Sequence, residues 1–259
     1  MLMRSSTAVK NFCIRVGIYR PARWLTRRLH SSQLQTYYDD IGFYRSLFSS
    51  SALCFDVGAN IGEKTEAMLK AGAHVVAFEP SPAALLELKA RCGRKKDCTL
   101  VATAVGSEVG IETLYATQNS DKSSLDSNWQ KAEDVVGTYR VPVVTLDVAI
   151  KAFGKPFYCK IDVEGWELEV LKGLTQPIPL ISFEFHLNEK GIPRTVSCLE
   201  RLLDFGQSYV NIAPAESAFF HLPEWVPIEK FLEWFPGDLK NTLPGDSYGD
   251  IFVKDTRPV

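Results

Sequence analysis

The fold of this chain is decided at Asp56-Val57-Gly58-Ala59-Asn60-Ile61-Gly62, which follows the apolar run Ala52-Leu53-Cys54-Phe55. Residues 63–70 come next and have the composition of a helix. A buried strand, a glycine turn and a helix N-terminus in this order form a binding place for a nucleoside-bearing cofactor. Gly58 permits a turn that a side chain would obstruct, and Gly62 lets backbone and ligand approach closely. We therefore expect an α/β domain with its cofactor at this turn.

The glycine spacing and the charge beside it restrict which cofactor the turn binds. Dinucleotide-binding turns follow G-x-G-x-x-G around a pyrophosphate, but this chain has Gly58-x-Asn60-x-Gly62 and lacks the third glycine. The G-x-x-x-x-G-K-[ST] pattern of a P-loop is also absent. Asp56 precedes the first glycine, and a carboxylate on the ligand side of the turn suits an ammonium group better than a pyrophosphate. The charge therefore favours S-adenosylmethionine over NAD.

Two further strand ends complete the predicted cofactor site. The apolar run 74–78 ends in Glu79, which follows Gly58 by 79 − 58 = 21 residues, close to the spacing of about 20 expected for an acid that binds ribose hydroxyls. A solvated strand end is the alternative, but the upstream turn makes the ribose role the better interpretation. The tip of the run 99–105, at Ala104 and Val105, is placed to meet an adenine edge; an ordinary buried strand is the alternative.

Several sequence blocks together resemble the FkbM family of methyltransferases. They are the turn at residues 56–62, Phe78-Glu79-Pro80, and Lys160-Ile161-Asp162-Val163-Glu164-Gly165-Trp166-Glu167, which is the most specific. Thr145-Leu146-Asp147 and Gly249-Asp250-Ile251-Phe252 also match, so the resemblance covers about residues 40–255. It implies a Rossmann-like class I methyltransferase fold over residues 41–259, with a mostly parallel seven-stranded sheet, helices on both faces and one antiparallel strand.

The resemblance also implies an activity. It indicates an S-adenosylmethionine-dependent O-methyltransferase that acts on a hydroxyl of a sugar, of a glycan or glycolipid, or of a polyketide-type acceptor. It further suggests that Ser124 approaches the cofactor. A catalytically inactive S-adenosylmethionine-binding or scaffold protein is the alternative, and a nicotinamide-dependent oxidoreductase is less favoured. The predicted cofactor-binding residues are Asp56, Gly58, Asn60, Ile61, Gly62, Thr65, Glu79, Pro80, Ala104, Val105, Ser124 and Asp162.

The rest of the domain alternates strand-like and helix-like segments, which predicts a mostly parallel sheet covered on both faces. The final strand is expected to be antiparallel. Residues 117–138 are polar and are expected to form a long loop, of the kind that often serves as a lid. The predicted strands are 52–56, 74–79, 99–105, 156–162, 180–186, 208–213 and 249–254, and the predicted helices are 62–71, 81–92, 145–152, 166–173, 193–205 and 227–235.

Acidic side chains follow two of these strands. Period-two alternation places Asp162 and Glu164 on one face with Lys160, and Glu184 on one face with His186. If the strands are neighbours, the four candidate catalytic residues converge where ligands bind in such sheets. Methyl transfer to oxygen needs a group that accepts the hydroxyl proton. We expect Asp162 and Glu164 to orient cofactor and acceptor, and Glu184 or His186 to be the base.

Each candidate also has a structural interpretation. A lone histidine at a strand end is more often structural than catalytic, Glu164 and Gly165 can simply open the next helix, and Lys160 can pair with Asp162 inside the fold. Carboxylates with one histidine could also hold Mg²⁺ or Mn²⁺. No local spacing demands a metal, so none is predicted.

Composition restricts the remaining possibilities. The 259 residues suit one α/β domain, and a net charge of −2 gives no reason to expect nucleic-acid binding. The six cysteines are scattered and form no C-x-x-C pair, which disfavours zinc or a disulfide framework and favours a cytoplasmic location. The sequence contains no apolar run near the roughly 18 residues that span a bilayer.

Residues 1–40 are predicted to form a basic amphipathic helical extension. Residues 1–38 carry seven lysines and arginines and no acid, and apolar residues recur there at helical spacing. Three interpretations compete: an interfacial helix on anionic lipid, an organellar transit peptide, or a helix packed on the domain with its basic face in water. The last, or a weak peripheral membrane contact through residues 1–30, is favoured.

Overall fold

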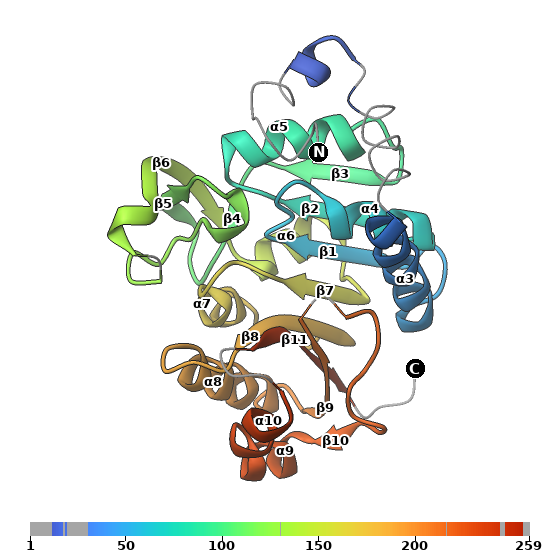
Figure 1. The fold of residues 1–259 in the computed structure, drawn as a ribbon, viewed down its shortest axis with the longest axis vertical. Coiled ribbons are helices and arrows are strands. Elements are labelled where there is room, and N and C mark those ends of the chain that lie inside the picture. Colours follow the sequence, from blue (N-terminus) through green and yellow to red (C-terminus); the bar gives the residue numbers. More distant parts are fainter. Residues whose placement is uncertain are drawn as a thin grey trace.

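A twisted eight-stranded sheet forms the centre of the molecule (Figure 1). This computed structural model describes residues 12–17, 19, 31–129, 131–215, 217–243 and 247–255. The strand order is β10-β9-β11-β8-β7-β1-β2-β3. The bounds are β1 Leu53–Val57, β2 His74–Phe78, β3 Cys98–Val101, β7 Tyr158–Ile161, β8 Leu180–His186, β9 Gln207–Pro214, β10 Val226–Pro227 and β11 Tyr248–Asp255.

The sheet confirms the predicted mostly parallel α/β architecture. β3, β2, β1, β7 and β8 pair in parallel, and β11 inserts antiparallel between β8 and β9, as expected for the last strand. Eight strands are present instead of seven, because the two-residue strand β10 adds an antiparallel edge next to β9. Strand order reverses between β1 and β7, and in open α/β sheets ligands bind at such a reversal.

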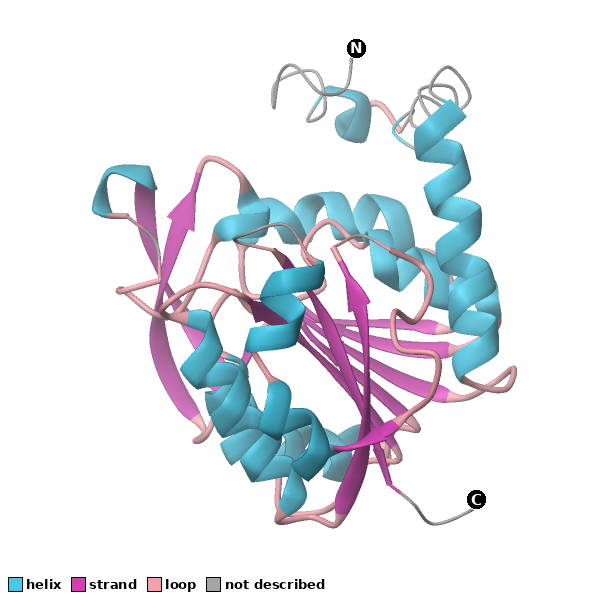
Figure 2. Cartoon of the chain, turned by 60° about the horizontal axis from the view of Figure 1, so that its bottom comes forward, coloured by secondary structure: helices cyan, strands magenta, loops and turns pink. Residues whose placement is uncertain are grey.

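Helices cover both faces of this sheet (Figure 2). The six predicted helices are confirmed to within two residues at each end, and N-caps explain two of the starts. The Ser81 and Thr145 hydroxyls accept from the backbone N–H groups of Ala84 and Val148. The helix bounds are α3 Ser31–Leu47, α4 Glu63–Ala71, α5 Pro82–Cys92, α6 Leu146–Phe153, α7 Glu167–Lys172, α8 Gly191–Leu203, α9 Ile228–Trp234 and α10 Gly237–Thr242.

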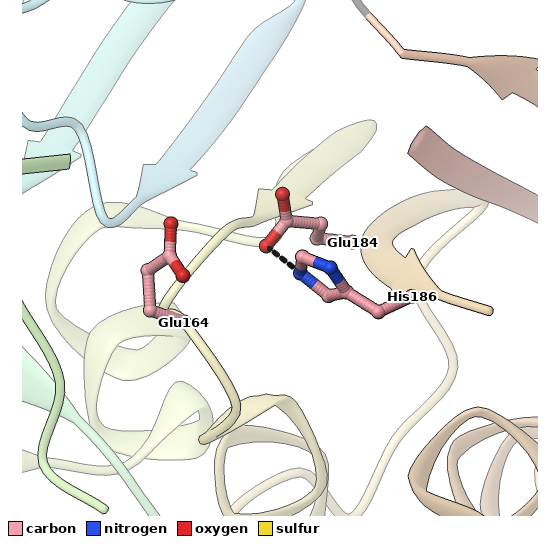
Figure 3. Close-up of side chains that lie close together, drawn as sticks. All are labelled: Glu164, Glu184 and His186. Carbon is pink, nitrogen blue, oxygen red and sulfur yellow. Dashed lines mark ion pairs between the residues drawn. The ribbon is translucent and has the colours of Figure 1, made fainter. Parts of the chain in front are cut away.

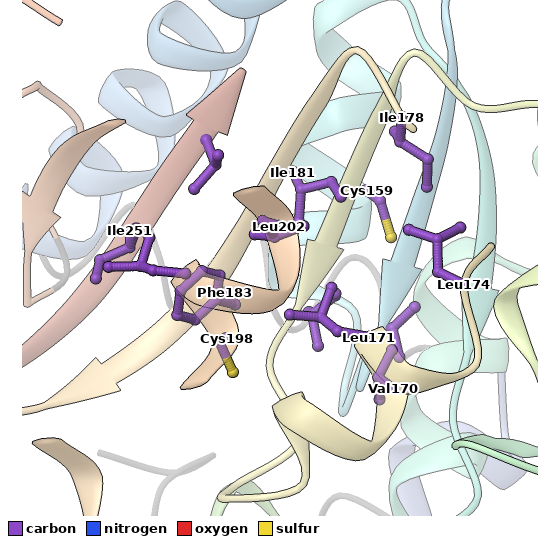
Figure 4. Close-up of a cluster of buried hydrophobic side chains, with 14 of the residues drawn as sticks. Cys159, Val170, Leu171, Leu174, Ile178, Ile181, Phe183, Cys198, Leu202 and Ile251 are labelled. Atoms are coloured by element: carbon purple, nitrogen blue, oxygen red, sulfur yellow. The ribbon is translucent and has the colours of Figure 1, made fainter. Parts of the chain in front are cut away.

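Strand alternation divides the core into two apolar layers. Phe55 and Val57 of β1 face the layer under α6, α7 and α8, whereas Cys54 faces the layer under α3 and α4. Burying both faces of the central strands explains their continuous apolar runs. Figure 4 shows side chains of the first layer, among them Cys159, Val170, Leu171, Ile181, Phe183, Cys198 and Leu202.

A second, small sheet lies beside the first, to the left of β1 and β2 in Figure 1. Its order is β4-β6-β5, with β4 Ala104–Val105, β5 Gly110–Thr117 and β6 Val135–Val144. The single predicted strand 99–105 was therefore wrong: β3 stays in the main sheet, and β4 pairs with β6 instead. The predicted loop 117–138 was too long, because its last residues belong to β6, whose exposed side chains made it look like a loop.

Helix α3 packs along the outside of the main sheet. Ile41, Tyr44 and Phe48 are buried, and Lys64 of α4 forms a 2.9 Å ion pair with Asp40. The boundary drawn between residues 40 and 41 thus falls inside one helix. The predicted amphipathic helix within residues 1–30 lies outside the described residues except for 12–17 and 19. Among the helices that the structure describes, none combines the length and apolar character needed to cross a bilayer.

Candidate active site

A cavity of about 1040 Å³ opens at the carboxyl ends of β1, β2, β7 and β8. Its other walls come from β4 and from the loop 118–134 that joins β5 to β6. The volume lies at the upper end of the roughly 300–1,000 Å³ usual for ligand pockets, so it suits a cofactor together with a second molecule. The long polar loop was expected to border the site, and residues 120–123 with Leu125 and Trp129 do so.

The cavity gathers most, but not all, of the predicted site residues. All four candidate catalytic residues line it, and so do six of the other cofactor candidates. The predicted residues that line the cavity are Gly58, Asn60, Glu79, Pro80, Ala104, Val105, Asp162, Glu164, Glu184 and His186. Five predicted cofactor residues are not in the cavity wall formed by the described residues: Asp56, Ile61, Gly62, Thr65 and Ser124.

The two glycines of the turn do different things. Gly58 has φ +83°, and a Cβ built there would lie 1.8 Å from the carbonyl oxygen of Asp162, so no larger residue fits between β1 and β7. Gly62 has φ +81°, and its Cβ would lie 2.5 Å from Leu88 Cδ1. In this structure the close neighbour of Gly62 is helix α5, and the approach of a ligand to Gly62 stays a prediction.

Asp56 is placed beneath the turn and not in the cavity wall. It is only 1 % exposed and accepts a 2.5 Å hydrogen bond from the Thr65 hydroxyl. In the sheet it lies opposite Lys160 of β7. Burial raises the pKa of Asp56, while Lys160 and the Thr65 hydroxyl act in the other direction. The expectation that this carboxylate points at the ligand side of the turn is thus not met by its side-chain position.

Glu79 does border the cavity, and its carboxylate is fixed by the turn itself. One oxygen accepts the Asn60 N–H at 2.7 Å and the other accepts the Ser81 N–H at 2.7 Å. Asn60 has φ +46°, a left-handed conformation that asparagine tolerates well. Burial raises the pKa of Glu79 to about 7, although the two hydrogen bonds act in the opposite direction and lower it. The carboxylate is therefore held rigidly at the end of β2, where ribose hydroxyls were expected.

Three side chains cluster on the opposite side of the cavity. His186 Nε2 lies 3.1 Å from Glu184 Oε2, and Glu164 faces this pair (Figure 3). Burial raises the pKa of Glu164 to about 8, with the Glu184 charge as the next cause. Burial also raises the pKa of Glu184 well above its usual range. β7 and β8 are neighbours, so the condition set for this convergence is met, and their pairing brings these groups together.

The sequence suggested that strand alternation places Asp162 and Glu164 on one face, but the structure contradicts this. β7 ends at Ile161, and Glu164 lies in a turn with φ +55°. Asp162 instead receives a 2.6 Å hydrogen bond from the Lys160 ammonium, which is 3 % exposed. The ion pair that was the structural alternative for Lys160 is therefore present, while Asp162 still reaches the cavity wall.

Two aromatic residues of this site were missed from the sequence. Trp129 Nε1–H donates to Glu164 Oε2 at 2.9 Å, and its ring meets the His186 ring edge-on at 5.1 Å. Tyr248 of β11 stacks on His186 at 5.9 Å. A tryptophan inside a polar loop was the available signal, since such a residue usually buries its ring and finds an acceptor for its N–H.

The loop that carries Trp129 is tied to the domain by buried polar contacts. The Ser124 hydroxyl, fully buried, donates to the Glu164 carbonyl at 2.6 Å. Arg194 of α8 pairs with Asp126, donates to the Gly165 carbonyl at 2.8 Å and lies 4.6 Å from the Trp129 ring centre. Ser124 thus anchors the loop to the turn after β7, and the structure does not place it in the cavity wall.

The parallel sheet with an inserted antiparallel β11, and a cavity flanked by a glycine turn and acidic strand ends, define a class I S-adenosylmethionine-dependent methyltransferase. The model of the methyltransferase FkbM domain matches residues 56–222. The chain belongs to the FkbM methyltransferase family, and S-adenosylmethionine is its cofactor. The resemblance noted in the sequence is thereby confirmed.

Individual relatives are more distant. The hexuronic acid methyltransferase AglP of Haloferax volcanii is 28 % identical over 131 residues, which are 50 % of this chain and 52 % of that protein. The chain therefore matches about half the length of this curated relative.

Solved structures with a similar fold include a TehB-like SAM-dependent methyltransferase from Corynebacterium glutamicum, at 12 % identity and TM-score 0.46 over 93 % of this chain and 99 % of that one. A precorrin-6y C5,15-methyltransferase from Geobacter metallireducens has 12 % identity and TM-score 0.44 over 85 % and 87 %.

Proposed function

We propose that this chain transfers the methyl group of S-adenosylmethionine to a hydroxyl of a sugar or glycan acceptor. The observation that carries the proposal is that one cavity is lined both by the glycine turn with Glu79 and by the cluster of Glu164, Glu184 and His186. One side suits a nucleoside cofactor, and the other suits a hydroxyl that must lose its proton. The named activity of AglP on a hexuronic acid supports a sugar as the acceptor.

The residues of the cofactor side fit S-adenosylmethionine. The backbone passes the cavity at Gly58 without a side chain, Glu79 offers carboxylate oxygens to the ribose hydroxyls, and Ala104 and Val105 border the position expected for adenine. Asp56 supports the turn from beneath and contributes negative charge toward the cofactor ammonium at longer range. When bound, the cofactor supplies a methyl group activated on a sulfonium sulfur.

The residues of the acceptor side are suited to position a hydroxyl and accept its proton. As the new carbon–oxygen bond forms, the hydroxyl proton passes to the Glu184–His186 pair, whose facing atoms are 3.1 Å apart. Glu164 and Asp162 border the same space and orient the acceptor. Holding the hydroxyl in line with the methyl group supplies much of the rate.

The test is a methyl-transfer assay on purified protein with a panel of sugar acceptors, including uronic acids and neutral glycosides, read as S-adenosylhomocysteine formed per acceptor consumed. Methylation of a sugar hydroxyl supports the proposal. Cofactor binding without transfer to any sugar would favour the inactive or scaffold alternative or a non-sugar acceptor.

The membrane contact through residues 1–30 stays a separate prediction. Their basic, acid-free composition would attract anionic lipid. Comparing the full chain with a chain lacking residues 1–30 in sedimentation with anionic vesicles tests it. Equal sedimentation of the two would contradict it.

A further inference from the structure

Glu164, Glu184 and His186 have the geometry of a cation site. One carboxylate oxygen from each glutamate and one ring nitrogen of the histidine lie within 4.8 Å of one another. The three come from two different places in the fold, the turn after β7 and the end of β8, and Figure 3 shows them directed toward a common space. The sequence alone gave no reason to choose a metal here, because the ligands are 20 and 2 residues apart and match no local motif.

Two facing polar atoms of this cluster are left without a hydrogen bond from the described residues. Glu184 Oε2 and His186 Nε2 are each buried, and neither has a hydrogen-bond partner among the described residues. They face each other at 3.1 Å. When the imidazole is neutral and its Nε2 carries a lone pair, two acceptor atoms at this distance repel, and burying them without a partner is costly. A cation bound by both atoms would remove this cost.

Three positive side chains around this site make their contacts elsewhere. Lys160 lies against Asp162 at 2.6 Å, and Arg194 pairs with Asp126. The Lys190 ammonium donates to the Asn128 carbonyl at 2.5 Å. Two partly buried carboxylates therefore share one space with a histidine, and none of these three cations is paired with either of them.

We propose that Glu164, Glu184 and His186 bind a divalent cation of the Mn²⁺ type. Two carboxylates and one imidazole are hard and intermediate ligands that suit such an ion, and three protein ligands leave coordination positions open. The surroundings are those of a metal site, because Trp129 holds Glu164 by its N–H and packs on His186, while Tyr248 stacks on the same ring.

The role of the ion toward the acceptor rests on the proposed function, but ion binding does not. A hydroxyl oxygen bound to the cation has a lowered pKa and loses its proton more readily. With an ion bound, Glu184 and His186 would be its ligands and the ion would supply the activation of the hydroxyl; without the ion, the pair itself accepts the proton.

The test is a titration of the full chain with MnCl₂ alone, following free Mn²⁺ by electron paramagnetic resonance. We expect saturable binding of one ion per chain in the wild type. In Glu184→Gln and in His186→Asn, which each lose one ligand, the affinity for Mn²⁺ should fall on the order of tenfold or more. Glu189→Gln is the matched control, since Glu189 borders the same cavity outside the cluster and loses the same charge. Its affinity should stay within about twofold of wild type.

Three results would overturn the site: no saturation at millimolar Mn²⁺, unchanged affinity in both cluster variants, or an equal loss in the control. Coupling of the bound Mn²⁺ to a histidine nitrogen, measured by pulsed resonance on the wild type, keeps the test decisive if the variants fold poorly; its absence contradicts the proposal. Methyl transfer that is unaffected by a chelator, with no Mn²⁺ bound, would leave the proposed function intact while removing the site. Binding of Mn²⁺ without methylation of any sugar would support the metal site and count against the proposed function.

Discussion

The two sides of the cavity treat buried charge in opposite ways. On the cofactor side, Asp56 and Glu79 are almost fully buried, but each carboxylate has a neutral donor from the protein: the Thr65 hydroxyl for Asp56, and two backbone N–H groups for Glu79. On the acceptor side, Glu184 and His186 present buried atoms to each other without a hydrogen bond. Both sides lie at the ends of neighbouring parallel strands.

This difference shows what each side is built to do. A carboxylate with its hydrogen bonds already made is rigid and offers its remaining lone pairs in a fixed direction, which suits recognition of a constant ligand. Unsatisfied groups are retained at a cost in stability, and such groups are typical of reaction sites. The cofactor side is therefore preorganised, and the acceptor side is completed by what binds there.

Gly58→Ala is expected to have the largest effect on cofactor binding. Its Cβ would meet the Asp162 carbonyl at 1.8 Å in a left-handed conformation, so β1 and β7 must move apart. We expect S-adenosylmethionine affinity to fall by on the order of 100-fold and unfolding free energy by roughly 2–4 kcal/mol. Gly137→Ala, which adds a methyl group to open space, is the control. Calorimetry and thermal unfolding measure both; an unchanged affinity would refute the assigned role of the turn.

The acceptor side is broken separately by Glu184→Gln and His186→Ala. Because we propose that these groups accept the hydroxyl proton, we expect kcat for methyl transfer to fall about 100-fold or more, while S-adenosylmethionine affinity stays within about threefold. Steady-state kinetics and calorimetry on the same preparations separate the two effects. A large loss of cofactor affinity with little change in kcat would mean that the two sides have been assigned the wrong way round.

The pH dependence of S-adenosylmethionine binding tests the role of Glu79 on the cofactor side. The pKa of Glu79 in the free protein is raised to about 7, so below this value the carboxyl is protonated and can accept fewer hydrogen bonds from ribose. Affinity is present above pH 7 and is lost as the pH falls: between pH 8 and pH 6 it should drop about tenfold more in wild type than in Glu79→Gln. Calorimetry at both pH values checks this. Parallel pH profiles in the two proteins would exclude Glu79 as the group concerned.

The smallest expected effect is that of Trp129→Phe. It keeps an aromatic ring near His186 but removes the N–H that holds Glu164 at 2.9 Å. We expect kcat/KM for the acceptor to fall roughly 3- to 10-fold, equivalent to about 1 kcal/mol for one hydrogen bond, with cofactor affinity unchanged. Trp225→Phe is the matched control, because Trp225 packs on Phe220 and is not among the residues that line the cavity. Equal kinetics of the two variants would show that Trp129 does not position the cluster.

The sequence predicted the parts of the molecule that depend on local pattern. The turn around Gly58, the acid at Glu79 and the order of helices and strands follow from spacing and apolar periodicity. The convergence of Glu184 and His186 with Glu164 could also be expected, because adjacent parallel strands end at the same edge. What the sequence could not give was the direction of the Asp56 side chain, since a residue near the end of a strand can face either layer until the register is known.

The second sheet and the loop were harder for a different reason. β5 and β6 expose several side chains, so their sequences lack the alternating apolar pattern that identifies a half-buried strand. Their pairing also links residues 18 to 33 positions apart around a loop, and no local signal specifies such a contact. Trp129 reaches His186 only because this loop folds back over the cavity, which explains why its role was not predicted.

The most direct test of the central claim is calorimetric titration of the purified chain with S-adenosylmethionine and, separately, with NAD, in wild type and in Glu79→Ala. The account predicts saturable binding of one S-adenosylmethionine per chain, no binding of NAD, and at least tenfold weaker S-adenosylmethionine binding in the variant, because the ribose hydroxyls lose their charged acceptor. Equal S-adenosylmethionine affinity in both proteins, or preferential binding of NAD, would contradict it.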